Sequence, residues 1–306
     1  MAPIKIWIKA FRLRTLPLAM SATVLGSFLA YDRGVFKWAV FVFGLLTTLF
    51  LQVLSNLAND YGDALKGTDN KKRIGPLRVT QSGLVTRKQM RRMIALFTML
   101  SLVSGCILIY AGLGISHGAG SENAKLYFLF FLLGITAIFA AIKYTVGKRP
   151  YGYAGFGDIM VFIFFGIIGV SGTYFLHTHS FYWTILLPAA AIGLFSVGVL
   201  NLNNLRDREN DRENGKMTLV VRMGLSWAKI YHLTLLLTGF LLSLTYTLIH
   251  FHSAYQFLFV LALPFLLSDM KKVLDNTVPV ELNNELKKLA IITLFFSFSF
   301  GLGLIL

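Results

Sequence analysis

Long apolar runs separated by short polar segments are the dominant pattern along this 306-residue chain. A helix of about twenty apolar residues is long enough to cross the hydrocarbon core of a bilayer. The pattern therefore predicts an all-α integral membrane protein with about nine spans, of which the eighth is the weakest because it is short and contains Pro264. The runs cover residues 15–31, 36–58, 93–113, 126–144, 158–177, 182–203, 227–250, 253–268 and 288–306.

The composition leaves little room for anything but this membrane domain. The chain is 56% hydrophobic and only 14% charged, so we expect one polytopic domain over residues 1–306. The first run resembles a signal peptide, but it ends at Tyr31, Asp32 and Arg33 without a small-residue cleavage pattern, and the next span follows at once. The single cysteine, Cys106, excludes an intramolecular disulfide and a cysteine-based metal site.

Basic residues predict the orientation. Of the 29 lysines and arginines, 26 lie in segments on one side of the predicted spans, and only Arg33, Lys37 and Lys125 lie on the other. The positive-inside rule places the basic side in the cytoplasm of a bacterial inner membrane, with the N-terminus inside and the C-terminus outside. The net charge of +15 lies in short membrane loops, which favours anionic lipid and a diphosphate as partners over nucleic acid. The sequence indicates no obligate protein partner.

Two acidic clusters end the second and sixth predicted spans, both on the cytoplasmic side. Each contains Asn-x-x-x-Asp followed by another aspartate, and residues three or four apart share a helix face. Hard oxygen ligands suit Mg²⁺, which shares its coordination shell readily with phosphate oxygens. Two facing clusters would therefore hold a diphosphate between metal ions. The first cluster comprises Asn56, Asn59, Asp60 and Asp63, and the second comprises Asn203, Asn204, Asp207 and Asp211.

A simpler interpretation is that these residues cap helix ends or form a solvated, charge-paired surface. Two matched clusters on one side of the membrane, each continuous with an apolar span, favour a functional site. Ionisable groups at membrane depth are costly and usually have a role.

The same residues resemble the aspartate-rich motifs of the UbiA-type intramembrane prenyltransferases, a family that is also similar in its nine helices. The similarity extends over nearly the whole chain. It is closest to the branch of the family that prenylates 1,4-dihydroxy-2-naphthoate. The segments that carry the resemblance are 52–63, 75–83, 150–153, 162–166, 172–174 and 203–207.

The resemblance implies a fold, a reaction and partners. Helices should surround a central cavity, with a cytoplasmic cap made by the 2–3 and 6–7 loops. The expected reaction is Mg²⁺-dependent transfer of a polyprenyl group from polyprenyl diphosphate to 1,4-dihydroxy-2-naphthoate, with loss of CO₂, to give demethylmenaquinone. Two Mg²⁺ ions acting as Lewis acids would help the diphosphate leave. The allylic cation would need a dry, aromatic-lined pocket.

The resemblance also implies roles for particular residues. Asp60, Asp63, Asp207 and Asp211 would bind metal, and Tyr144 would join them as a catalytic residue. The third aspartate of the family's first motif is replaced by Gly67, and Asp69 is the nearest substitute. Tyr144 and Lys148 fit the family's Tyr-x-x-x-Lys spacing. The expected substrate-binding residues are Asn56, Asn59, Lys72, Arg78, Thr80, Gln81, Lys148, Tyr151, Asn203, Asn204 and Arg206.

Other functions fit less well. A cation-coupled transporter would place its carboxylates near the bilayer midplane rather than at its cytoplasmic edge. A CDP-alcohol phosphotransferase would need both aspartate pairs in one short motif, whereas Ala64 follows Asp63 here and the second pair lies 147 residues further on. Within the prenyltransferases, 4-hydroxybenzoate and homogentisate remain alternative acceptors.

Overall fold

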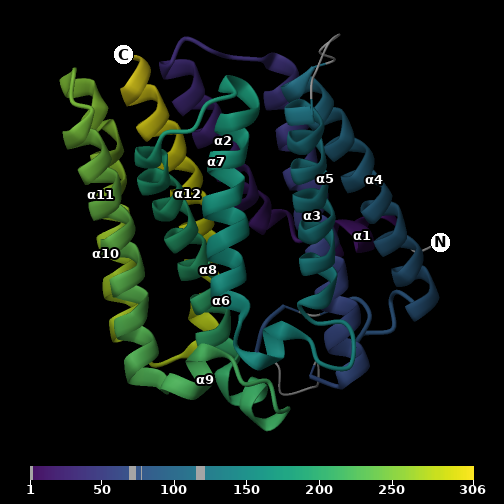
Figure 1. Cartoon of the computed structure of the whole chain (residues 1–306). Coiled ribbons are helices and arrows are strands. Elements are labelled where there is room, and N and C mark those ends of the chain that lie inside the picture. The colour runs from purple at the N-terminus through teal and green to yellow at the C-terminus, as the bar shows by residue number, and fades with distance from the viewer. Residues whose placement is uncertain (1–2, 69–73, 77, 115–120) are drawn as a thin grey trace.

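The computed structural model describes residues 3–68, 74–76, 78–114 and 121–306, without the side chains of residues 121–123. Every regular element in these residues is helical (Figure 1). The α-helices are α1 (Ile4–Phe11), α2 (Leu16–Asp32), α3 (Trp38–Lys66), α4 (Arg87–Leu113), α5 (Ser121–Lys143), α6 (Gly157–Val161), α7 (Gly169–Thr178), α8 (Leu186–Glu213), α9 (Leu219–Met223), α10 (Leu225–Ile249), α11 (Leu263–Asp275) and α12 (Leu282–Ile305).

The long helices confirm a multi-pass membrane protein. In the described residues, eight helical segments are long and apolar enough to cross a bilayer. One of them, Gly157–Thr178, joins α6 to α7 through a π-helical stretch, Phe162–Ile168. The weak eighth run of the sequence is a composite of a 3₁₀ helix, Ala254–Ala262, that continues directly into α11. The 3₁₀ helix and α11 together cover the run, and no single regular helix extends over it.

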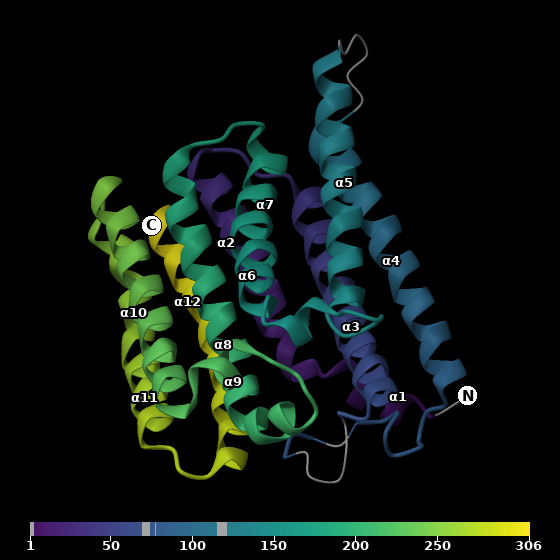
Figure 2. The ribbon, with the colours of Figure 1, turned by 60° about the horizontal axis from the view of Figure 1, so that its bottom comes forward.

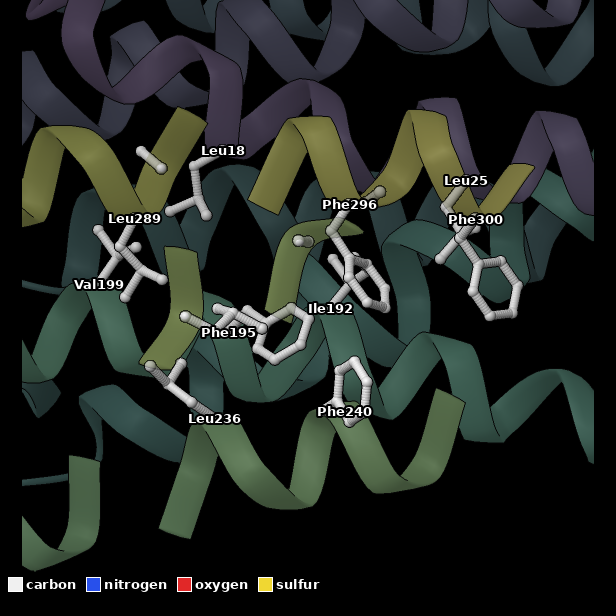
Figure 3. Packing of buried hydrophobic residues seen from close by; sticks show 14 of the residues in the cluster. Leu18, Leu25, Ile192, Phe195, Val199, Leu236, Phe240, Leu289, Phe296 and Phe300 are labelled. Atoms are coloured by element: carbon white, nitrogen blue, oxygen red, sulfur yellow. The ribbon is translucent and has the colours of Figure 1, made fainter. Parts of the chain in front are cut away.

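The aromatic core joins helices from both ends of the chain. α2 packs against α12, and α8 packs against α10 and α12. Figure 3 shows Phe195 of α8 beside Phe296 of α12, whose ring centroids are 5.0 Å apart in an edge-to-face contact. Large apolar side chains such as Phe128 and Leu248 are instead exposed on the outside, as expected for a surface that faces lipid.

Both aspartate motifs lie at the same end of the helix bundle. α3 and α8 run toward this end, where α9 also lies, and the C-terminus lies at the opposite end (Figures 1 and 2). α1 packs across α3, with Trp7 buried in a cluster that also contains Val79 and Val85 of the following loop. The N-terminal helix therefore supports the loop that covers the first motif.

The opposite end is tied by one lysine. The Lys37 ammonium donates hydrogen bonds to the carbonyl oxygens of Gly112 (2.7 Å) and Leu176 (3.3 Å). These carbonyls belong to the last turns of α4 and α7, where carbonyl groups lack helical partners. A positive charge is also favourable at a helix C-terminus. Lys37 thus fixes two helix ends far from the aspartates.

Small residues allow the closest approach between helices. A Cβ atom on Gly166, in the π-helical stretch, would lie 2.6 Å from both the Ala189 carbonyl oxygen and the Gly193 Cα of α8. Glycine at both positions lets the two backbones touch, as is common in membrane helix packing.

Gly166→Ala is therefore expected to destabilise the protein by about 1–3 kcal/mol, because overpacking forces the helices apart. The measurement is the thermal unfolding temperature in detergent. Gly134→Ala in α5 is the matched control, since a Cβ there has no heavy atom within 4 Å. Equal unfolding temperatures for the two variants would contradict the close packing of these helices.

Candidate functional site

The first motif lies within the last three turns of α3, and Val79 and Thr80 of the following loop fold back onto it. The two carboxylate oxygens of Asp60 accept hydrogen bonds from the backbone N–H groups of Val79 (3.1 Å) and Thr80 (3.2 Å). Asp60 and Val79 are both buried. The carboxylate therefore determines where the loop lies, and the loop in turn places Thr80 at the end of α3.

Asp63 lies one turn further along α3 and binds two side chains. It accepts hydrogen bonds from Arg78 Nη2 at 3.3 Å and from the Tyr153 hydroxyl at 2.8 Å. The Tyr153 hydroxyl also contacts Thr68, just after the αL glycine, Gly67, that ends the helix. Asp63 thus joins α3 to two loops at this end of the bundle.

The second motif, on α8, is held largely by an arginine of its own. Arg206 is almost fully buried, and its Nε donates to Asp207 at 3.0 Å. Its remaining nitrogens reach Asn203 of α8 at 2.8 Å and Asn283 of α12 at 2.9 Å. Arg206 therefore neutralises Asp207 and anchors α12 at the same time.

Asp211 lies one turn beyond Asp207 and is paired with a lysine from the loop that follows. One of its oxygens lies 3.5 Å from Lys216 Nζ, and both side chains are buried. Its other oxygen, Oδ2, is buried with no hydrogen-bond partner among the described residues. Asp211 is therefore the motif carboxylate with coordination capacity left over.

Electrostatics link the two motifs through Lys216. Burial lowers the pKa of the Lys216 ammonium, but Asp211 and Asp63 outweigh this effect, so the pKa is raised above its ordinary value. Burial raises the pKa of the Tyr144 phenol to about 12, while Lys216 opposes that rise. Near neutral pH the lysine is charged and the phenol is neutral. One cation therefore interacts with carboxylates of both motifs.

The tyrosine pair beside the motifs is fixed by a glycine. The rings of Tyr144 and Tyr151 meet edge to face, with centroids 5.4 Å apart, and the Tyr151 hydroxyl donates to the Ala140 carbonyl oxygen. A Cβ on Gly152 would lie 2.6 Å from the Tyr144 carbonyl oxygen, so only glycine allows this turn to pack against Tyr144. Burial also raises the pKa of Tyr151, which keeps it neutral.

The remaining predicted binding residues lie in different surroundings. Asn56 donates to the Phe11 carbonyl oxygen and to Thr15, so its amide connects α3 to the N-terminal segment. Asn59 accepts a hydrogen bond from Thr145, Gln81 lies in the turn after Thr80, and Lys148 is exposed. Lys72 and Asp69 lie outside the described residues. For all the residues of this paragraph, the predicted roles in binding substrate or metal stay predictions.

Sequence reasoning missed Lys216, Tyr153 and Asn210 as members of the site. Asn210 donates from its side chain to the Thr68 carbonyl oxygen at 2.9 Å and so connects α8 to the end of α3. Lys216 was counted only among the basic residues that set the orientation. Its position five residues after Asp211, just beyond the end of α8, is the available signal.

The oxygen atoms of this site fit a hard cation. In the described part of the chain, no three acidic, histidine or cysteine side chains already form a compact metal cage. Three buried oxygens nevertheless lack hydrogen-bond partners there: Asp211 Oδ2, Asn204 Oδ1 and Thr80 Oγ1. Carboxylate, amide and hydroxyl oxygens are suitable Mg²⁺ ligands.

Comparison with known proteins places this arrangement in a family. The profile of the UbiA prenyltransferase family matches residues 19–298. The chain is 45% identical over 306 residues to 1,4-dihydroxy-2-naphthoate octaprenyltransferase of Haemophilus influenzae, covering 99% of this chain and 96% of that protein. The enzyme of the same name from Escherichia coli is 41% identical over 300 residues, covering 98% of this chain and 95% of its own.

Solved structures share the fold. The apo structure of a UbiA homologue from Aeropyrum pernix superposes with a TM-score of 0.65 at 18% identity, covering 100% of this chain and 98% of that one. A UbiA homologue from Archaeoglobus fulgidus, bound to GPP and Mg²⁺, gives 0.61 at 15% identity, covering 96% and 99%. Because the family profile and both relatives extend over nearly its whole length, this chain belongs to the UbiA prenyltransferase family.

Proposed function

We propose that the protein transfers a polyprenyl group from polyprenyl diphosphate to 1,4-dihydroxy-2-naphthoate. The main support is its similarity to two relatives named for this reaction, at 45% and 41% identity over nearly the full chains. The two aspartate motifs at one end of the bundle supply the chemistry that the reaction needs. The apolar tail of the donor would lie among the helices and its diphosphate at their ends.

Mg²⁺ fits the oxygen-rich site, and Asp60, Asp63, Asp207 and Asp211 would hold it as a pair of ions, one for each motif. When bound, the metal would neutralise the diphosphate and make it a better leaving group. Arg78 and Thr80 lie beside the first motif and would bind phosphate oxygens directly. Lys72, Lys148, Asn59 and Arg206 remain candidates for the same role.

The chain's own residues would control the reacting centre. Breaking the allylic C–O bond releases diphosphate and leaves positive charge on the prenyl carbon. The electron-rich naphthoate ring attacks that carbon from its carboxylated position, and loss of CO₂ restores aromaticity, so the first product is the quinol form of demethylmenaquinone. The neutral rings of Tyr144 and Tyr151, which meet edge to face, would face the cation and exclude water. No redox cofactor is needed for this step.

We also propose that the site faces the cytoplasm, with the C-terminus outside. The support is the distribution of basic residues, 26 of 29 on one side of the spans. A cytoplasmic site would receive both soluble naphthoate and the diphosphate head directly.

The aspartates should be essential for turnover. Asp60→Asn, Asp63→Asn, Asp207→Asn and Asp211→Asn should each lower the rate about a hundredfold or more, since each removes a carboxylate from the metal site. The assay follows prenylated product in membranes by mass spectrometry, with expression level checked for each variant. Asp275→Asn, at an exposed position of α11, should retain full activity. Wild-type turnover in excess EDTA would refute the metal requirement.

The acceptor should be the bicyclic acid. Purified protein with Mg²⁺ and a prenyl diphosphate should consume 1,4-dihydroxy-2-naphthoate and release one CO₂ for each product molecule. A panel containing 4-hydroxybenzoate and homogentisate provides the comparison. Prenylated 4-hydroxybenzoate that keeps its carboxylate, with dihydroxynaphthoate left untouched, would show that the acceptor is wrong while the family chemistry is right.

The orientation can be tested with cysteines in a Cys106→Ser background. Ser82→Cys, exposed on the loop over Asp60, should resist an impermeant thiol reagent in intact spheroplasts and react in inverted vesicles. Lys125→Cys, exposed at the far end of α5, should show the reverse pattern. Labelling of residue 82 from outside would overturn the proposed topology.

A further inference from the structure

Lys216 occupies an unusual position for a lysine in this protein. Its ammonium lies 3.5 Å from Asp211 and 5.5 Å from the centre of the Tyr153 ring, and its side chain is only 7% exposed. The Tyr153 hydroxyl in turn donates to Asp63. A single buried cation therefore stands between a carboxylate of the second motif and a tyrosine bound to the first.

The backbone around Lys216 is fixed from both sides. The Lys216 N–H donates to the Asp211 carbonyl oxygen at 2.8 Å, and the Met217 N–H donates to the Tyr153 carbonyl oxygen at 3.0 Å. Thr218 then caps α9 through the Val221 N–H. Because the main chain is held on each side, the lysine is directed into the site by the fold and does not reach it as a flexible surface side chain.

The other motif carboxylates have different partners. Asp60 binds backbone N–H groups, Asp63 binds Arg78, and Asp207 binds Arg206. Within the described residues, Lys216 is the cation paired with the Asp211 carboxylate. Removal of one member of a buried ion pair leaves an uncompensated charge, so Asp211 depends on this lysine as long as no other cation is present.

We infer that Lys216 is an internal counter-ion that holds the two aspartate motifs together without metal and competes with the divalent cation for Asp211. This inference rests on the proposed function, since it assumes that these carboxylates bind Mg²⁺. Lys216 is a positioning residue, acting through the carboxylates. Without diphosphate, Mg²⁺ would have to displace the Lys216 ammonium or bind close to it, and repulsion between the two positive charges would make this binding weak. Mg²⁺ arriving with a diphosphate brings negative charge that satisfies the ammonium, so the site fills with metal when the substrate is present.

The test measures metal binding by thermal stability of the detergent-purified protein, without any turnover. Wild type, Lys216→Met and Lys216→Gln are unfolded in EDTA and then across a Mg²⁺ titration. Both variants should unfold at lower temperature than wild type in EDTA. Half-maximal stabilisation should then need about tenfold less Mg²⁺, because the competing charge is gone. Added pyrophosphate should narrow the gap between wild type and variants.

Two controls sharpen the result. Lys216→Arg keeps the charge and should match wild type in its Mg²⁺ midpoint, and Lys88→Met, at an exposed position of α4, should match it throughout. Lys216→Gln can still hydrogen-bond to Asp211, so it serves if Lys216→Met does not fold. An unchanged or higher Mg²⁺ midpoint in Lys216→Met and Lys216→Gln overturns the inference. This holds also when these variants bind pyrophosphate more weakly than wild type. Turnover that survives EDTA would instead refute the metal requirement on which this inference rests.

Discussion

The burial of four carboxylates at the ends of two apolar helices is the constraint on which this structure depends. An unpaired buried charge is costly, so each aspartate must be compensated locally. Backbone N–H groups compensate Asp60, and Arg206 compensates Asp207. The donors to Asp60 come from the loop after α3, and the partner of Asp207 is its neighbour on α8, so local folding of the chain and neutralisation of these aspartates occur together.

The two motifs are compensated differently, and this difference bears on chemistry. Asp60 is fixed by two main-chain donors, and Asp207 by an arginine that is anchored on α12 through Asn283. Neither arrangement changes easily. Asp211 has a single lysine partner at 3.5 Å and a free oxygen, Oδ2, among the described residues. A site that must accept and release a charged substrate needs some carboxylates held rigidly and others able to change partners, and Asp211 is the one suited to exchange.

The sequence predicted the elements better than it predicted the contacts, for a physical reason. Span length and charge asymmetry follow from the bilayer, which acts on each segment separately, so the long helices could be read from hydropathy alone. The composite of Ala254–Ala262 and α11 covers the run predicted as the weakest span, and it is not among the eight helices of the described residues that are long and apolar enough to cross a bilayer; its 3₁₀ geometry has no hydropathy signal. The inward position of Lys216 depends on tertiary packing, because a run of charged loop residues does not indicate which side chain will be buried. The hydrogen bond from the Asn56 amide to the Phe11 carbonyl oxygen is likewise a tertiary contact that the sequence motif does not indicate.

Glycines connect the membrane packing to the site. Gly152 lets the turn after α5 lie against Tyr144, and Gly62 lets α3 approach Thr145, where an added Cβ would be 2.5 Å from the hydroxyl. Thr145 in turn donates to the Ala58 carbonyl oxygen and to Asn59, in the turn that begins the first motif. The aromatic residue proposed to face the cation and the helix that carries Asp60 are thus held by two close contacts at consecutive residues, Tyr144 and Thr145. A side chain at either glycine would move Tyr144 relative to the aspartates without touching one of them, so reaction geometry here is set by backbone proximity as much as by the charged groups.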